Sequence, residues 1–86
     1  MKILLEKLQE LERLEEITSR IEEDYDREPE NVEFEKAFDA AYKEEFNAYV
    51  GAAKYIEHIT AGRIDFLTAK AMIQTKREEL KQILAI

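Results

Sequence analysis

An acidic segment near residue 28 is the first place where residue types and spacing could bind a metal ion. Four carboxylates match positions 1, 3, 5 and 12 of a helix-loop-helix calcium site: Asp24, Asp26, Glu28 and Glu35. Position 6 of such a loop needs glycine for its sharp bend, but here it is Pro29, whose ring prevents a positive φ. We therefore reject a calcium loop and interpret the segment as a solvated acidic turn. A weak cation site and a partner-binding tip are the alternatives.

Transition-metal and nucleophilic chemistry lack the partner residues they need. His58 is the only histidine and the chain has no cysteine, whereas helix-borne metal sites need a second histidine or paired Glu-x-x-His units. Ser19 is the only serine and lies outside any G-x-S-x-G context. We expect no enzymatic activity, no cofactor and no metal, and we expect His58 at the surface.

Two charged residues, Glu45 and Lys76, interrupt apolar helical faces in the second half of the chain. A lone buried charge is costly, so each needs a partner or access to solvent. If the segments on either side of residue 62 pack antiparallel, Lys76, Arg77 or Lys81 would approach Glu45. One interpretation is an inter-helix polar contact that fixes the register, and the other is a Glu45 that reaches solvent at the bundle edge. The candidate members of the contact are Glu45, Tyr42, Tyr49 and Lys76.

A basic stripe follows the last third of the chain. Its members fall at i, i+4, i+7 and i+11 and would share one helix face: Lys70, Gln74, Arg77 and Lys81. Such a stripe could track phosphates, but it holds three charges in a chain of net charge −7 and has no aromatic residues between them. We keep weak DNA or RNA binding as an alternative and do not expect it, because a solvated face or an acidic partner explains the same residues.

Acidic residues are the other surface feature. Glu12, Glu16 and Glu23 extend the acidic turn along the first helix and could let the protein act as a decoy that mimics nucleic acid. The partner-binding candidates are therefore Glu12, Glu16, Glu23, Asp24, Asp26, Glu28, Lys70, Arg77 and Lys81.

Three helices must position these residues. Apolar side chains recur at steps of three or four, which is the helical period, and Pro29 and Gly62 divide the pattern into helices at about 2–27, 31–60 and 65–85. Asn31 and Asp65 are suitable N-caps. Gly51 lies inside the second helix, where we expect a neighbouring backbone to come close.

Length and charge bound the organisation. The 86 residues predict one helical domain, 1–86, whose net charge is −6 over residues 1–31, −3 over 32–62 and +2 over 63–86. The first apolar run is too short for a signal segment, and no run of about 18 apolar residues could span a membrane. With no cysteine present, we expect a soluble cytoplasmic protein.

The sequence therefore predicts an all-α fold, specifically an elongated, coiled-coil-like three-helix antiparallel bundle. The wide apolar face of the second helix and the small size lead us to expect a homodimer. The leading function is a non-catalytic protein interaction module, such as an adaptor, regulator or inhibitor. A phage or mobile-element accessory protein would fit these properties, although no residue specifies that setting.

Overall fold

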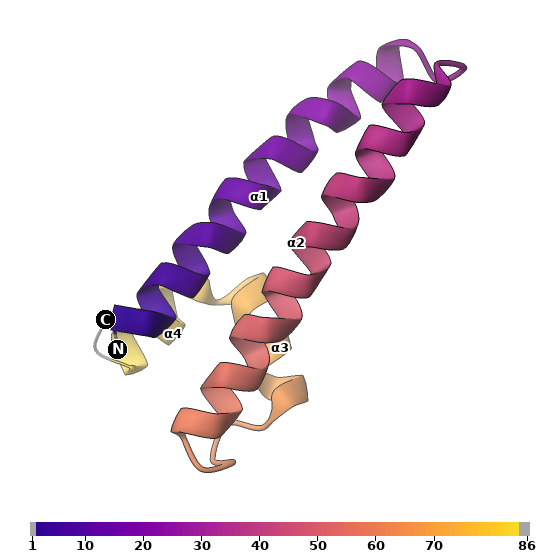
Figure 1. Cartoon of the computed structure of the whole chain (residues 1–86). Coiled ribbons are helices and arrows are strands. Elements are labelled where there is room, and N and C mark those ends of the chain that lie inside the picture. The colour runs from indigo at the N-terminus through magenta and orange to yellow at the C-terminus, as the bar shows by residue number, and fades with distance from the viewer. Residues whose placement is uncertain (1, 85–86) are drawn as a thin grey trace.

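The computed structural model describes residues 2–84, which form helices joined by short turns and contain no strand. The helices are α1 (Lys2–Arg27), α2 (Val32–Ile59), α3 (Phe66–Thr75) and α4 (Arg77–Ile83). Helices α1 and α2 form a long antiparallel hairpin. At one end of it, α3 packs against α2 and α4 follows α3, placing Leu80 in the shared core (Figure 1). The predicted all-α class is confirmed.

The turn at Pro29 ends α1 and starts α2 through local hydrogen bonds. The backbone N–H of Glu28 donates to the Asp24 carbonyl (3.1 Å), and the N–H of Asn31 donates to the Glu28 carbonyl (3.0 Å). The side-chain oxygen of Asn31 then accepts from the N–H groups of Glu33 (3.0 Å) and Phe34 (3.3 Å). Asn31 is thus the N-cap of α2, as a residue of its type predicts.

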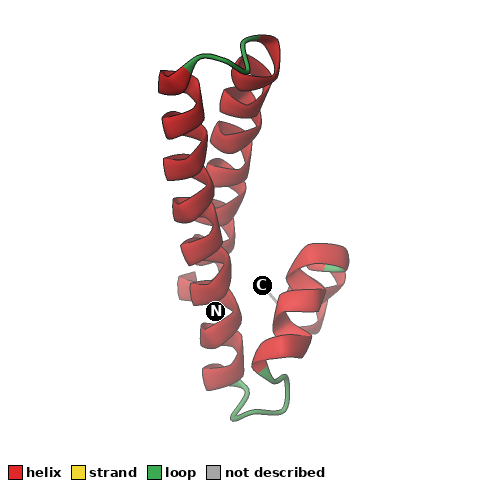
Figure 2. Cartoon of the chain, turned by 90° about the vertical axis from the view of Figure 1, so that its right-hand side faces the viewer, coloured by secondary structure: helices red, strands yellow, loops and turns green. Residues whose placement is uncertain are grey.

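The turn between α2 and α3 depends on a left-handed backbone. Gly62 has φ 82° and its N–H donates to the Glu57 carbonyl (2.9 Å), which is the role that favours glycine after a helix. Asp65 caps α3 by accepting from the Thr68 N–H (2.7 Å), and the Glu57 carboxylate accepts from the Phe66 N–H (2.8 Å). This turn brings α3 back alongside α2 (Figure 2).

The single helix predicted at 65–85 is wrong in one respect, because it is interrupted at Lys76. That residue has φ −139° and ψ 40° and separates α3 from α4. Just before it, the Thr75 hydroxyl donates to the Ala71 carbonyl (2.8 Å), a local bond that competes with regular helix. After the interruption, α4 places Arg77 and Lys81 beside carboxylates of α1. The chain is therefore not a simple bundle of three helices.

The core lies at the end of the hairpin that α3 and α4 cover. Each helix contributes to one cluster of fully buried residues: Leu4, Leu8, Leu11, Ala52, Ala53, Ile56, Ala69, Ile73 and Leu80. Leu14 and Thr18 are the last buried residues of α1, and no residue from 19 to 51 is buried. We call residues 16–45 the distal hairpin. The distal hairpin projects beyond the core and makes the molecule elongated, with overall dimensions of 46 × 20 × 18 Å.

Candidate interaction surface

The two cations of α4 are used within the chain. The guanidinium of Arg77 donates to both carboxylate oxygens of Glu15 (2.7 and 3.0 Å), and the ammonium of Lys81 lies 3.2 Å from Glu12. Arg77 also donates through Nε to the Ile73 carbonyl (3.1 Å) at the end of α3. The hydrogen bonds to Glu15 raise the pKa of Arg77. These contacts hold α4 against α1.

Lys70 is likewise held by neighbouring residues. Its ammonium lies 5.9 Å from the ring centre of Tyr49 and 5.2 Å from that of Phe66, distances at which a cation and a ring attract each other. The Tyr49 hydroxyl donates to the Lys70 carbonyl (2.8 Å) and so joins α2 to α3. The predicted basic stripe is therefore not a free face, which weakens its interpretation as a nucleic-acid surface.

The structure does not join Glu45 to the predicted cations. Lys76 lies at the helix interruption and is exposed, while Arg77 and Lys81 face Glu15 and Glu12 of α1. Within residues 2–84, Glu45 has no ion-pair partner within 4.0 Å and no side-chain hydrogen bond. Arg77 and Lys81 do not reach Glu45, because α4 directs their side chains toward α1 after Lys76.

A row of aromatic side chains continues along the face of α2 that α3 covers at Tyr49, and Tyr25 of α1 extends it. We call Tyr25, Phe38, Tyr42 and Phe46 the aromatic row. The centres of the rings lie 5.8 Å apart for Tyr25 and Phe38 and 6.2 Å apart for Phe38 and Tyr42, and Phe46 lies 6.4 Å from Tyr49. Because α3 ends at Thr75, it leaves two members of this row uncovered: Tyr42 is 52% exposed and Phe46 is 47% exposed, while Tyr25 and Phe38 are partly buried.

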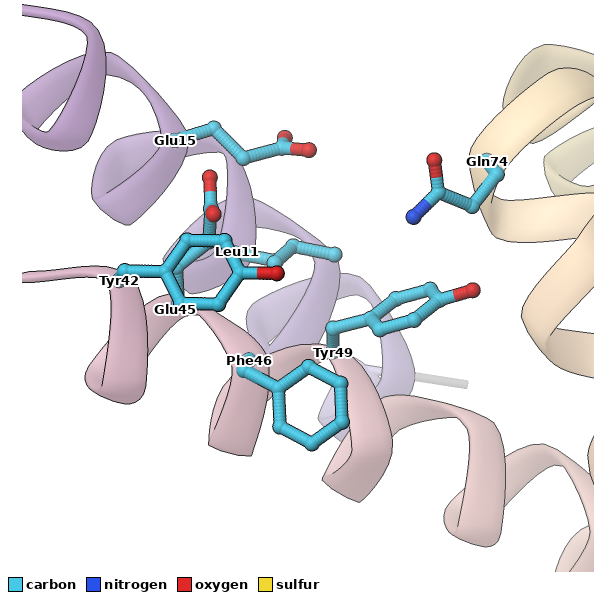
Figure 3. A pocket seen from close by; sticks show the side chains of 7 residues that line it. All are labelled: Leu11, Glu15, Tyr42, Glu45, Phe46, Tyr49 and Gln74. Atoms are coloured by element: carbon cyan, nitrogen blue, oxygen red, sulfur yellow. The ribbon is translucent and has the colours of Figure 1, made fainter. Parts of the chain in front are cut away.

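A hollow of about 260 Å³ opens where α3 ends and the uncovered row begins. We call it the notch. Figure 3 shows side chains of α1, α2 and α3 around it, with the carboxylates of Glu15 and Glu45 and the amide of Gln74 facing its interior. Its lining residues are Leu11, Glu15, Tyr42, Glu45, Phe46, Tyr49 and Gln74.

The Glu45 carboxylate lies in an unfavourable environment for a negative charge. Partial burial raises its pKa, and the nearby charges of Glu15 and Glu22 raise it further. Glu15 forms an ion pair with Arg77, whereas Glu45 has no cation beside it among the described residues. The notch therefore combines an uncompensated carboxylate with the exposed rings of Tyr42 and Phe46.

The acidic candidates on α1 and at the tip are exposed, apart from the half-buried Asp24, and only some of them are paired. Glu16 pairs with Arg20 (2.6 Å), and Asp24 pairs with Arg27. Glu23, Asp26 and Glu28 are exposed, as is Glu12 beside Lys81. Within residues 2–84, no three His, Cys, Asp or Glu side chains gather where they could hold a metal ion.

Two further sequence expectations concern α2. His58 is exposed, as predicted. The expectation for Gly51 is wrong within this chain, because a Cβ added there would meet no atom within 4 Å. Gly51 instead faces a shallow groove between α1 and α2, so packing inside the molecule does not require glycine there.

Sequence reasoning missed Glu15, Phe46 and Gln74 as members of one site. The aromatic spacing of Phe38, Tyr42 and Phe46 was visible as part of a wide apolar face. Its exposure depends on where α3 ends, and the sequence near Lys76 contains no glycine or proline to indicate that point.

Comparison of the chain with protein-family models, with curated proteins and with solved structures finds no match. Among the helices of residues 2–84, none combines the length and apolar character needed to cross a membrane.

Proposed function

We propose that this protein is a non-catalytic interaction module that binds a protein partner through the aromatic row and the notch. The observation that carries the proposal is that α3 stops at Thr75 and leaves Tyr42 and Phe46 about half exposed beside it. Aromatic side chains at a partly apolar surface are typical of the residues that dominate protein interfaces.

The position of the row indicates how a partner would dock. The exposed rings lie on the same face of α2 that α3 covers nearer the core. A helix from the partner would fit along this face and complete, in the complex, the elongated three-helix bundle that the sequence predicts. The chain would then act as an adaptor, regulator or inhibitor.

A homodimer is the second candidate, in which another copy covers the same row. Its support is the uncovered aromatic surface of a small chain whose core occupies one end only. Light scattering at micromolar concentration tests it: twice the chain mass, reduced to one mass by Phe38→Ser, would support the dimer. A single-chain mass would remove it.

The acidic decoy remains an alternative because the distal hairpin is strongly charged. Residues 16–45 hold twelve acidic and four basic side chains, a net charge of −8. Partner binding that DNA competes away, and that survives substitution of the aromatic row, would favour the decoy over the adaptor.

Capture from a lysate of the source cells tests the proposed function. The bait variants are Phe38→Ser and Phe46→Ser, and the matched control is Leu67→Ser, which removes a 72% exposed apolar side chain from α3. We expect a protein retained by the wild type and by Leu67→Ser and lost by both row variants. Equal retention by all four baits would contradict docking on the row.

A further inference from the structure

We propose that the notch binds an arginine side chain of the partner, carried on an amphipathic helix that lies along the aromatic row. This inference rests on the proposed function and names the chemistry of the partner. The arginine would pair with Glu45 and stack against Tyr42 and Phe46.

Charge selects a basic partner over a second copy of the chain. The net charge of −8 over residues 16–45 contrasts with +1 over the rest of the sequence. Two copies that face each other through the aromatic row would bring these acidic regions together. Like charges opposed across an interface cost binding energy, whereas a cationic helix gains it.

The notch presents one carboxylate that a cation would complete. Glu15 and Glu45 face the same hollow, and Glu15 already accepts two hydrogen bonds from Arg77. Glu45 is the equivalent acceptor on α2 without a cation among the described residues. A guanidinium from outside the chain would give Glu45 what Arg77 gives Glu15.

The rings beside Glu45 favour arginine over lysine. A planar guanidinium can donate two hydrogen bonds to a carboxylate while it stacks on an aromatic face, whereas an ammonium is a strongly hydrated point charge. The same face of α2 already attracts one cation, because Lys70 lies over the ring of Tyr49. Tyr42 and Phe46 offer rings on this face that remain exposed.

The shape of the site favours a side chain on a helix over a free small molecule. The volume of about 260 Å³ is near the lower limit of ligand pockets, about 300 Å³. The notch continues into the row from Phe46 to Phe38, which spans about 12 Å of helix at ~1.5 Å per residue. A partner helix of two to three turns could therefore place one arginine in the notch and its apolar side chains on the row.

Binding of designed peptides to the full chain tests the inference. Three amphipathic peptides of about 16 residues share one leucine face and carry arginine, lysine or glutamate at the polar positions. The protein variants are Glu45→Gln and the matched control Glu44→Gln, which removes the exposed neighbouring charge on the same helix. Binding is measured by calorimetry at fixed ionic strength.

We expect the arginine peptide to bind the wild type most tightly, and Glu45→Gln to weaken it by about tenfold, as for the loss of a charge-assisted pair. Glu44→Gln should change its affinity by less than about twofold, because an exposed charge contributes little. Carboxyl NMR should also show that the arginine peptide lowers the pKa of Glu45, because a nearby cation favours the ionised form.

Three results of the peptide experiment would overturn the inference, and a fourth comes from light scattering. They are equal binding of the arginine and glutamate peptides, equal losses for Glu45→Gln and Glu44→Gln, and no binding of the arginine peptide up to about 1 mM. A dimer held by the row, as judged by light scattering, would assign the face to a second copy and also overturn it. Capture that depends on Phe38 would still support the proposed function in any of the first three cases.

Discussion

At the scale of single residues, Glu45 is the most unusual side chain, because its partly buried carboxylate has no cation beside it among the described residues. It lies on α2 beside Tyr42 and Phe46, lines the notch together with Glu15, and has its pKa raised by partial burial and by nearby negative charge. A group retained in such a position costs the free protein stability and leaves an acceptor for a ligand.

Glu45→Gln should stabilise the free protein at neutral pH. The raised pKa means that the folded chain binds this proton more tightly than the unfolded chain. The contribution of Glu45 to the free energy of unfolding therefore decreases as the pH rises from its ordinary pKa of 4.5 through the raised pKa of the folded state. Urea unfolding at pH 4 and pH 7 should show a wild-type deficit relative to Glu45→Gln that is larger at pH 7. Lower stability of the variant at pH 7 would instead indicate that Glu45 makes a stabilising inter-helix contact.

Gly51→Ala should stabilise the protein by about 0.5–1 kcal/mol, because alanine is the better helix former and the added Cβ meets no atom within 4 Å. Gly62→Ala is the matched control. It should destabilise the protein, because Gly62 has φ 82°. Thermal unfolding of both variants measures the difference, and a loss of stability in Gly51→Ala would indicate that a second chain packs closely on that groove.

At the scale of elements, the interruption at Lys76 determines how α3 and α4 cover the hairpin of α1 and α2. Helix α3 follows α2, and α4 then carries Leu80, Arg77 and Lys81 to α1. The same change of direction leaves Tyr42 and Phe46 exposed beyond Thr75. One local irregularity therefore completes the core and opens the notch.

Arg77→Gln should destabilise the protein by about 1–2 kcal/mol, because it removes a two-pronged, partly buried pair with Glu15 and leaves that carboxylate in the notch without a cation. The matched control is Arg20→Gln, which removes an exposed pair within α1 and should cost less than about 0.5 kcal/mol. Urea titrations give both values. Equal effects would mean that the pair between Arg77 and Glu15 contributes no more to stability than an exposed pair within one helix.

The limits of α1 and α2 and the start of α3 are largely predictable from local chemistry. The division between α3 and α4 is not. The range of α1 coincides with the predicted 2–27, and the cap by Asn31, the turn at Gly62 and the cap by Asp65 all follow from residue type. The interruption at Lys76 has no breaker residue. It accompanies the long-range pairing of Arg77 with Glu15, 62 residues away in sequence, which helical periodicity does not record.

The candidate site was predictable only in its parts, for the same reason. The aromatic spacing and the unusual position of Glu45 were readable from the sequence. Their meeting with Glu15 and Gln74 in one notch depends on where α3 ends relative to α1 and α2. The predicted pairing of Glu45 with the basic residues assumed one straight third helix, and the interrupted helix sends those cations elsewhere.

At the scale of the whole molecule, stability is unevenly distributed. The core occupies one end, while residues 19–51 include no buried residue. The distal hairpin is held by contacts between α1 and α2 alone among the described helices. Regions with little buried apolar surface open locally at lower free energy than a packed core.

Hydrogen exchange should therefore divide the hairpin across its length. Amides of residues 20–26 and 35–45 should exchange at least about tenfold faster than those of 8–14 and 52–58, because a difference of about 1.4 kcal/mol in opening free energy produces that ratio. Measurement by NMR resolves both ranges in one sample. Uniform protection along both helices would show that the two-helix end opens only with the whole protein.

The elongated shape, with its acidic charge concentrated in the distal hairpin, has a consequence for the speed of binding. The molecule is 46 Å long, several times the screening length of about 8 Å at physiological salt, so a basic partner would sense the acidic end before the positively charged remainder. Stopped-flow measurements should show an association rate that falls steeply as salt rises. The dissociation rate, set by the buried rings, should change little. The distal hairpin would thus orient an approaching partner before any side chain touches it.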